Sequence, residues 1–207
     1  MTSPIKLYRN PKSGHCHRVE LMMSLLDVPY ETVDLDMANG AHKAPEYLQI
    51  SPLGQVPAID DDGTTLSDSN GILAYLVSRY GSDDWIGTTP VEKAEIQRWL
   101  SIAAGEIASG PAAARLVTVF GAGLDHAAAK AKAHGLFKVM EAALDGKTFL
   151  VGERLTIADV AGYSYVAHAP EGGVSLDAYP NIQSWLARIE ALPKFVGMAK
   201  SPIPDAA

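Results

Sequence analysis

One short stretch gathers the side chains that could do chemistry. It runs from Asn10 to Leu26 and reads "NPKSGHCHRVELMMSLL". It holds Ser13, His15, Cys16 and His17, and Cys16 is the only cysteine among the 207 residues. These residue types are compatible with a metal site, with a nucleophile, or with a site that binds and activates a thiol. Spacing and position along the chain separate the three.

The spacing argues against a metal site and against a serine hydrolase. Neighbouring side chains on a helix point about 100° apart, so His15, Cys16 and His17 cannot share one ion. The remaining histidines show neither H-x-x-E-H nor H-E-x-x-H spacing. Ser13 is not framed by the G-x-S-x-G motif of a hydrolase nucleophile. We therefore predict no metal site and no hydrolytic serine.

The argument for a thiol-binding site starts from the position of Ser13. Ser13 stands at the N-cap of a predicted helix, where unpaired backbone N–H groups and about half a positive charge gather. Lowering a thiol pKa of ~8.5 by two units takes about 2.7 kcal/mol of stabilisation of the thiolate. A serine hydroxyl together with helix N–H groups can supply this. Capping alone is a common role for serine at this position, so the residues leave both roles open.

Composition excludes several classes of function. The net charge of −7 argues against a nucleic-acid-binding protein. No apolar run reaches 18 residues, so we expect no transmembrane helix, and the N-terminus lacks a signal core. A single cysteine cannot form an internal disulfide, which fits a reducing, cytoplasmic compartment.

Charge is distributed unevenly at the N-terminus. No acidic residue precedes Glu20, whereas Lys6, Arg9, Lys12 and Arg18 all fall in that stretch. A small positive region in an acidic protein would suit a small anionic ligand. Scattered surface cations are the alternative interpretation.

The first 81 residues predict a small α/β domain. "IKLYRN" reads as a strand, and the helix after Ser13 carries apolar residues at i, i+3, i+4 and i+7. "PYETVDLDM" reads as a second strand, and "GAHKAPEYLQISPLG" as a loop with one helical turn. "QVPAIDDDGTTLSDS" predicts a hairpin, which is followed by a helix with its apolar stripe at residues 72–80.

The rest of the chain predicts a linker and an all-helical domain. Residues 82–90 are rich in Gly, Ser, Thr, Asp and Pro, which is typical of a linker. Residues 91–207 are helical in pattern almost throughout, and Pro111 should kink or end its helix. Thr156 and Asp159 form a T-x-x-D capping pattern. We predict an α/β domain followed by an all-α domain.

A second candidate cluster lies in "GQVPAI" and "LSDSNGILAYL". Asp68 and Ser69 stand at the start of a predicted helix, where N-capping is the ordinary role of both residue types. The alternative is a ligand site, with an amine held by Asp68 and a carboxylate held by Ser69 and the helix N-terminus.

Four motifs, in this order, resemble the glutathione S-transferase family: "SGHCHRV", "PEYLQISPLGQVPAI", "LSDSNGILAYL" and "LTIADV". The resemblance covers nearly the whole chain. It implies a thioredoxin-like domain followed by an all-helical domain, with glutathione as co-substrate lying across the ends of the strands. It further implies a cytoplasmic homodimer that detoxifies small hydrophobic electrophiles, with no metal, nucleic acid or membrane involved.

The resemblance also implies roles for individual residues. Ser13 matches the catalytic serine of the theta, tau and phi classes, whereas the beta class has cysteine there. His42 matches a histidine near the glycine end of glutathione. Gln55 and Val56 match the residues that hold its cysteine, with a cis bond between Val56 and Pro57.

The glutamyl end and the pocket rim complete the implied site. Asp68 and Ser69 match the acid–serine pair that grips the γ-glutamyl group, although the usual acid is Glu, one methylene longer. Thr156 and Asp159 match a structural capping box. Residues that could line the pocket or its electrophile side are Pro11, Lys12, His15, Cys16 and the helix from Ile107 to Leu116.

Several alternatives stay open. Tyr8 is a rival hydroxyl, because some classes use tyrosine. Cys16 reads as a packed thiol, and His15 and His17 could line the pocket or face solvent. The same fold could serve a glutathione-dependent disulfide reductase or peroxidase, or a binding protein without catalysis.

Overall fold

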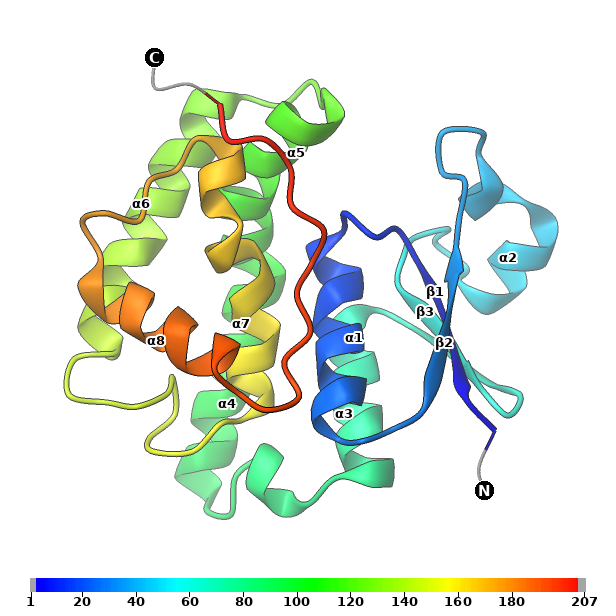
Figure 1. Ribbon diagram of the computed structural model, residues 1–207, viewed down its shortest axis with the longest axis horizontal. Coiled ribbons are helices and arrows are strands. Elements are labelled where there is room, and N and C mark those ends of the chain that lie inside the picture. Colours follow the sequence, from blue (N-terminus) through cyan, green and yellow to red (C-terminus); the bar gives the residue numbers. More distant parts are fainter. Residues whose placement is uncertain (1–2, 205–207) are drawn as a thin grey trace. The chain divides into compact units, whose positions relative to one another are not determined.

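The computed structural model describes residues 3–204, and its contacts divide the chain into two units (Figure 1). The first unit holds the residues up to Asp83 together with Lys194–Ala199. The second holds Asp84–Pro193 and the residues from Lys200 on. A segment close to the C-terminus therefore belongs to the N-terminal unit, which local sequence patterns do not indicate.

The first unit contains a four-stranded mixed sheet in the order β2-β1-β3-β4. β1 runs parallel to β2, whereas the β1–β3 and β3–β4 pairs are antiparallel. Ile5, Leu7 and Ile59 are fully buried in this sheet, so alternate residues of the short strands supply its core. The strands are β1 (Ile5–Arg9), β2 (Tyr30–Asp34), β3 (Ala58–Asp61) and β4 (Thr64–Ser67).

Helices cover both faces of this sheet (Figure 1). α1 (Gly14–Leu25) and α3 (Ser69–Tyr80) contact each other on one face, and α2 (Pro45–Ile50) lies on the other. The expected order of strand, helix, strand, strand, strand, helix is confirmed, and with it the thioredoxin-like arrangement. The segment expected to be a loop with one turn holds a 3₁₀ turn, η1 (Ala41–Lys43), and then α2.

The C-terminal segment is fastened to α1. The hydroxyl of Ser24 donates to the carbonyl oxygen of Lys194 at 2.7 Å. Nε2 of His17 lies 2.8 Å from the carbonyl oxygen of Val196, and its ring meets Phe195 edge-on. His17 is only 2% exposed, so it neither lines a pocket nor faces solvent. Its role is to hold this segment against the helix.

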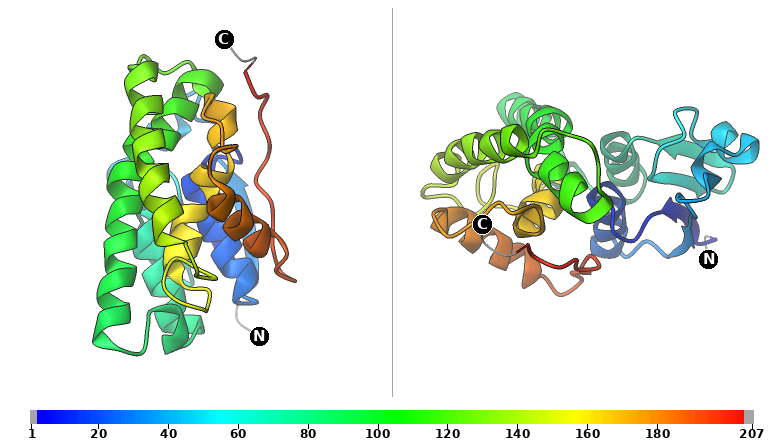
Figure 2. Two further views of the ribbon diagram at one scale, coloured as in Figure 1. Left: turned by 90° about the vertical axis from the view of Figure 1, so that its left-hand side faces the viewer. Right: turned by 90° about the horizontal axis from the view of Figure 1, so that it is seen from above.

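The second unit is helical, as expected. Residues 90–120 form one uninterrupted helical segment. The next helix, residues 126–143, packs beside it (Figure 2). A single 3₁₀ turn, η2 (Asp83–Trp85), precedes the segment of residues 90–120. The helices are α4 (Pro90–Ile102), the π-helical η3 (Ala103–Ala112), α5 (Ala113–Phe120), α6 (His126–Ala143), α7 (Ile157–Ala167), the 3₁₀ turn η4 (Ala169–Gly172) and α8 (Pro180–Glu190).

The helix does not end at Pro111. The chain stays helical through this residue because it adopts π geometry before continuing into α5. The wider π turn accommodates a residue that lacks the N–H for an α-helical bond. Next to it, a Cβ on Gly110 would lie 3.1 Å from the backbone nitrogen of Ala133, so this glycine permits the close approach of α6.

Two capping boxes fix helix starts in this unit. The predicted box at Thr156 is confirmed: Oδ2 of Asp159 accepts from the backbone N–H of Thr156 at 2.9 Å and from its hydroxyl at 3.1 Å. A second box, not predicted, starts α4, where Thr89 Oγ1 accepts from the N–H of Glu92 at 3.2 Å and Glu92 Oε2 accepts from the N–H of Thr89.

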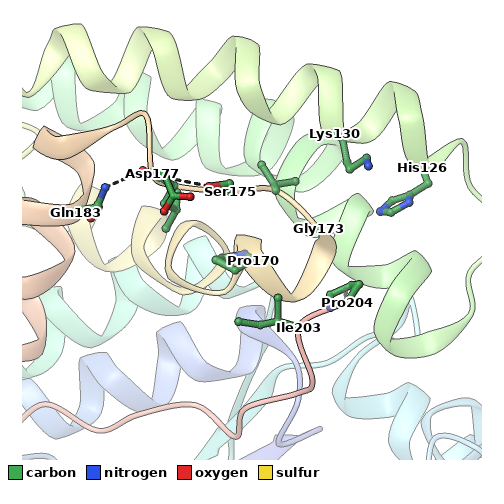
Figure 3. Close-up of a pocket in the computed structure, with 11 residues that line it drawn as sticks. His126, Lys130, Pro170, Gly173, Ser175, Asp177, Gln183, Ile203 and Pro204 are labelled. Atoms are coloured by element: carbon green, nitrogen blue, oxygen red, sulfur yellow. Dashed lines mark hydrogen bonds between the residues drawn. The ribbon is translucent and has the colours of Figure 1, made fainter. Parts of the chain in front are cut away.

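A cavity of about 690 Å³ lies in the helical unit and contains none of the predicted site residues (Figure 3). Its polar side chains serve the fold: Nε2 of His126 lies 2.8 Å from the carbonyl oxygen of Gly172, and Gln183 donates to that of Leu176. Among residues 3–204, no helix is long and apolar enough to cross a membrane. Within the same range, no three His, Cys, Asp or Glu residues gather as metal ligands would.

Candidate functional site

A cavity of about 230 Å³ in the first unit brings together three segments that are distant in sequence. They are the start of α1, the turn before β3 and the start of α3. Every lining residue is one that the sequence singled out. Ser13 and His42 are not among the lining residues, which are His15, Gln55, Val56, Pro57, Asp68 and Ser69.

Asp68 shapes the α3 side of the cavity. It is the N-cap of α3, and its Oδ1 accepts from the N–H groups of Asn70 at 3.0 Å and Gly71 at 2.9 Å. Its backbone has φ = 72°, a left-handed conformation that costs a non-glycine residue about 1–3 kcal/mol. Strain of this kind often marks a binding site. Asp68 therefore caps α3, as expected, and its strained backbone is consistent with a second role in binding a ligand.

The turn before β3 is held by two side chains that sequence reasoning missed. The hydroxyls of Tyr47 and Ser51 donate to the carbonyl oxygen of Gln55 at 2.7 and 2.9 Å. The N–H of Gln55 donates back to Ser51 Oγ at 3.2 Å. The Val56–Pro57 bond is cis, as the resemblance implied. Tyr47 lies in α2, so this short helix, predicted as one turn within a loop, positions the turn before β3.

Ser13 is the N-cap of α1, as predicted. Oγ of Ser13 accepts from the backbone N–H of Cys16 at 3.4 Å. Cys16 is 1% exposed, and its sulfur accepts from the N–H of Asn10 at 3.4 Å. Burial raises the pKa of Cys16 to about 11. Cys16 is therefore a packed thiol that does not line the cavity.

This burial predicts how Cys16 reacts. An unfolded cysteine has a pKa of ~8.5, so at that pH it is about half ionised, whereas the native thiol stays protonated. We expect alkylation by iodoacetamide at pH 8.5 to be at least about 100-fold slower in the native protein than in urea, because the thiolate is the reacting form. Rapid, stoichiometric labelling of the native protein would show that Cys16 is accessible. Mass spectrometry of the labelled protein measures the difference.

His15 lines the cavity as a neutral imidazole. Burial, and secondly the charge of Arg18, lower the pKa of His15 to about 3. Its Nδ1 lies 3.4 Å from Oγ of Ser69. His15 and Ser69, which are far apart in sequence, thus lie next to each other in the lining of the cavity. The question of whether His15 faces solvent or lines a pocket is resolved in favour of the pocket.

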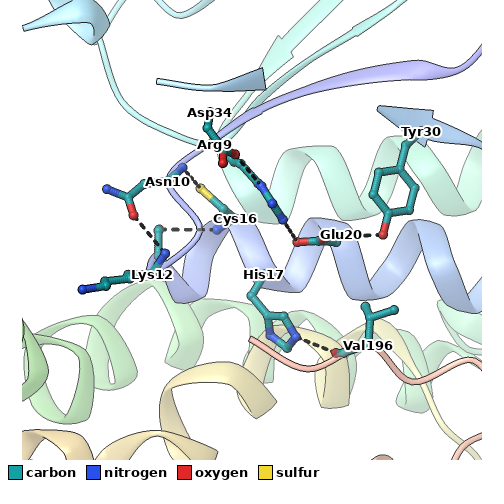
Figure 4. A network of polar contacts seen from close by, with 10 residues as sticks. Arg9, Asn10, Lys12, Cys16, His17, Glu20, Tyr30, Asp34 and Val196 are labelled. Atoms are coloured by element: carbon teal, nitrogen blue, oxygen red, sulfur yellow. Dashed lines mark hydrogen bonds and ion pairs between the residues drawn. The ribbon is translucent and has the colours of Figure 1, made fainter. Parts of the chain in front are cut away.

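Of the four cations expected near the N-terminus, Arg9 is paired with carboxylates. Arg9 pairs with Glu20 and with Asp34, at 2.8 Å for the second pair (Figure 4). Arg18 is buried, and its Nη1 donates to Ser69 Oγ at 3.1 Å. The exposed cations that remain are Lys6 and Lys12, and Lys12 stands beside Pro11 in the turn before α1.

Two further predicted residues lie in the same unit. His42 is in η1, and its Nδ1 is buried with no hydrogen-bond partner among the described residues. Tyr8, the rival hydroxyl, is half-buried in β1 and meets the ring of Tyr47 edge-on with 5.8 Å between centroids. Neither lines the cavity.

The cavity offers four groups to a ligand: the carboxylate of Asp68, the hydroxyl of Ser69, a helix N-terminus, and Val56 in the turn before β3. A carboxylate can hold an amine, and a helix N-terminus can hold a carboxylate. Backbone groups that border a cavity can pair with the backbone of an extended peptide. The set therefore suits a short peptide with a free α-amino and α-carboxyl group.

Comparison with known proteins agrees with this chemistry. Residues 3–78 match the family model "Glutathione S-transferase, N-terminal domain", and residues 124–193 match "Glutathione S-transferase, C-terminal domain". Glutathione S-transferase 3 of Zea mays is 31% identical over an alignment that covers 98% of this chain and 96% of that protein.

Solved structures agree as well. A glutathione S-transferase from Pseudomonas fluorescens superposes with a TM-score of 0.88 at 31% identity, covering 96% of this chain and 100% of that one. A glutathione transferase homologue from Drosophila mojavensis, with bound glutathione, gives a TM-score of 0.83 at 26% identity, with coverages of 93% and 90%. The sequence match and the shared fold lead to one conclusion: the chain belongs to the glutathione S-transferase family.

Proposed function

We propose that this protein is a glutathione transferase in which Ser13 stabilises the thiolate of bound glutathione for attack on a small hydrophobic electrophile. The observation that carries the proposal is the cavity itself. It is lined by six of the residues that the resemblance implies or places at the pocket, and they come from three separate segments of the chain. A structural relative at 26% identity holds bound glutathione.

The γ-glutamyl group is assigned to the start of α3. The amine of glutathione pairs with the carboxylate of Asp68, and its α-carboxylate accepts from Ser69 and from the helix N-terminus. Oδ1 of Asp68 accepts the capping hydrogen bonds, and Oδ2 is the oxygen assigned to the amine. The left-handed backbone of Asp68 supports this assignment, because strain persists where the surroundings hold a functional geometry in place.

The cysteinyl and glycyl parts are assigned to the other segments. The backbone of Val56 pairs with the cysteinyl backbone, and the Tyr47 and Ser51 hydroxyls keep that turn rigid through Gln55. The buried, unpartnered Nδ1 of His42 supports a contact of His42 with the glycine end, since a buried polar atom without a partner is costly.

Ser13 is the group assigned to the thiol. Its Oγ already accepts from the N–H of Cys16, so its hydroxyl hydrogen remains to be donated. Donation to sulfur favours the thiolate, and the proton of the glutathione thiol leaves to solvent. The thiolate sulfur then forms a bond to the electrophilic carbon, and the leaving group departs with its electron pair. Ser13 needs only to stabilise the anion and does not take up the proton.

The test is a calorimetric titration with glutathione at neutral pH, with the ultraviolet absorbance of the thiolate followed in parallel. We expect saturable binding with a rise in thiolate absorbance, and neither signal in the wild type would overturn the proposal. Asp68→Asn should keep the cap, because asparagine caps as well as aspartate, but lose the charge that holds the amine. We expect affinity to fall about 10-fold, the scale of one charge-assisted hydrogen bond.

A matched control separates the charge from the cap. Asp125 is the exposed N-cap of α6, where its Oδ1 accepts from the N–H of Ala128 at 2.9 Å. Asp125→Asn should leave the affinity for glutathione unchanged. An analogue that lacks the glutamyl amine should bind wild type and Asp68→Asn equally. If Asp68→Asn binds glutathione like the wild type, the assignment of the amine to Asp68 is wrong.

A further inference from the structure

A buried arginine lies directly beneath the start of α3. Arg18, in α1, is 1% exposed, and its Nη1 donates to Oγ of Ser69 at 3.1 Å and to Oδ1 of Asn70 at 2.9 Å. Both acceptors belong to the first turn of α3, beside the cavity. The proposed function gives Arg18 no part, although a guanidinium is rarely buried without a specific task.

The contact with Arg18 takes up one of the two lone pairs of the Ser69 hydroxyl. A guanidinium has donors and no acceptor, so Oγ of Ser69 must accept from Arg18. The hydroxyl hydrogen of Ser69 is thereby left for an acceptor elsewhere. In the structure Oγ of Ser69 lies 3.4 Å from Nδ1 of His15, a long contact that a ligand can displace.

The start of α3 also favours a carboxylate as the ligand group next to Ser69. The N–H groups of Asn70 and Gly71 are used by Asp68 Oδ1. Ser69 is the first helical residue, so the helix itself provides no partner for its N–H. A carboxylate arriving in the cavity would therefore meet two donors on one residue, the N–H and the O–H of Ser69. An amide NH₂ arriving at Ser69 would meet only the second lone pair of its Oγ, next to the positive charge of Arg18.

We propose that Arg18 is a positioning residue: it occupies one lone pair of the Ser69 hydroxyl, favours donation by that hydroxyl toward the cavity, and so makes the site prefer a carboxylate at the glutamyl end. The buried positive charge of Arg18 acts in the same direction, because it is little screened by solvent. The inference rests on the proposed function, since it deepens the recognition of glutathione at the same cavity.

The experiment compares two ligands in folded variants. The ligands are glutathione and its analogue with the glutamyl α-carboxylate converted to a carboxamide. Wild type should prefer glutathione by about 20-fold, the scale of charge-assisted hydrogen bonds. Arg18→Met removes the donor and the charge, and should reduce that preference to less than about threefold, since Ser69 is then free to turn its oxygen toward the amide. Arg18→Lys restores a donor and a charge and should recover part of the preference.

The matched control is on the same helix. Arg79 lies exposed in the last turn of α3, over the ring of Tyr80. Arg79→Met makes the same substitution and the same change in net charge, and should keep the wild-type preference. If the role of Arg18 is purely structural, Arg18→Met should weaken the binding of both ligands equally and leave the ratio of their affinities unchanged. An unchanged ratio in folded Arg18→Met overturns the inference.

A second measurement uses the wild type and does not depend on the variant folding. Nitrogen-15 NMR follows the guanidinium signals of Arg18. Saturating glutathione should shift them, whereas the saturating carboxamide analogue should leave them near their position in the free protein. Equal shifts overturn the inference. If the wild type binds no glutathione, the proposed function falls and this inference with it; if it binds glutathione but the ratio survives in Arg18→Met, only the inference falls.

Discussion

Ser13→Ala is expected to lower kcat/KM for conjugation of glutathione to a model aryl halide by about 25- to 50-fold at pH 6.5–7. The reason is the fraction of bound glutathione that is ionised: a thiol whose pKa returns from ~6.5 to ~8.5 is mostly protonated at pH 6.5–7. The deficit should shrink to less than about fivefold above pH 9, where even an unassisted thiol ionises. Steady-state measurements of kcat/KM for both proteins between pH 6.5 and 9.5 test this expected pH dependence.

Ser13→Asp separates catalysis from capping, the two roles that the sequence left open. Aspartate caps a helix as well as serine, so the free energy of unfolding should stay within about 0.5 kcal/mol of wild type. A carboxylate accepts but does not donate, and its charge repels a thiolate. The variant should thus be stable and at least as inactive as Ser13→Ala. Ser13→Thr keeps both the cap and the donor, and should retain most of the activity.

Tyr8→Phe is the matched control for the rival hydroxyl. It removes one hydroxyl from β1 and leaves the aromatic ring against Tyr47. We expect nearly wild-type kcat/KM and an unchanged pH profile. If Tyr8→Phe is inactive while Ser13→Ala conjugates glutathione normally, the tyrosine supplies the hydrogen bond and the assignment to Ser13 is wrong.

The parts of the fold that sequence predicted are those set by local signals. The N-cap at Ser13 and the box at Thr156 and Asp159 follow from residue types within four positions of each other. The strand–helix order follows from hydrophobic periodicity. The members of the cavity, such as Val56 and Ser69, came from motif resemblance, and the geometry that brings them together was not readable from spacing.

What sequence missed depends on contacts between distant residues. Arg18 and Ser69 are 51 positions apart, and His17 and Val196 are 179 apart, so no local pattern reveals either pair. The helix α2 has six residues, too few for a periodic signal, yet its Tyr47 fixes the turn at Gln55. Of the two outcomes predicted at Pro111, a kink or an end of the helix, the end is wrong, because the chain continues past this residue in π geometry.

Asp159→Asn is expected to destabilise the helical unit by about 2–4 kcal/mol, through loss of buried hydrogen bonds. Asp159 is fully buried, and its two oxygens accept four hydrogen bonds. Oδ1 accepts from the N–H of Leu150 and from Trp185 Nε1, both at 2.9 Å. Oδ2 accepts from the N–H and hydroxyl of Thr156. Burial raises the pKa of Asp159, whereas the four donors oppose that rise by favouring the carboxylate.

An asparagine amide cannot reproduce this arrangement, because its NH₂ would face two donors whichever way it turns. We expect the thermal midpoint to fall by roughly 5–15 °C, measured by circular dichroism and calorimetry. The control is again Asp125→Asn, the same change at an exposed cap with one hydrogen bond, which should shift the midpoint little. Since the residues that line the cavity all belong to the other unit, the folded fraction of Asp159→Asn should bind glutathione with wild-type affinity. A folded, stable variant that had lost glutathione binding would instead place Asp159 in the site.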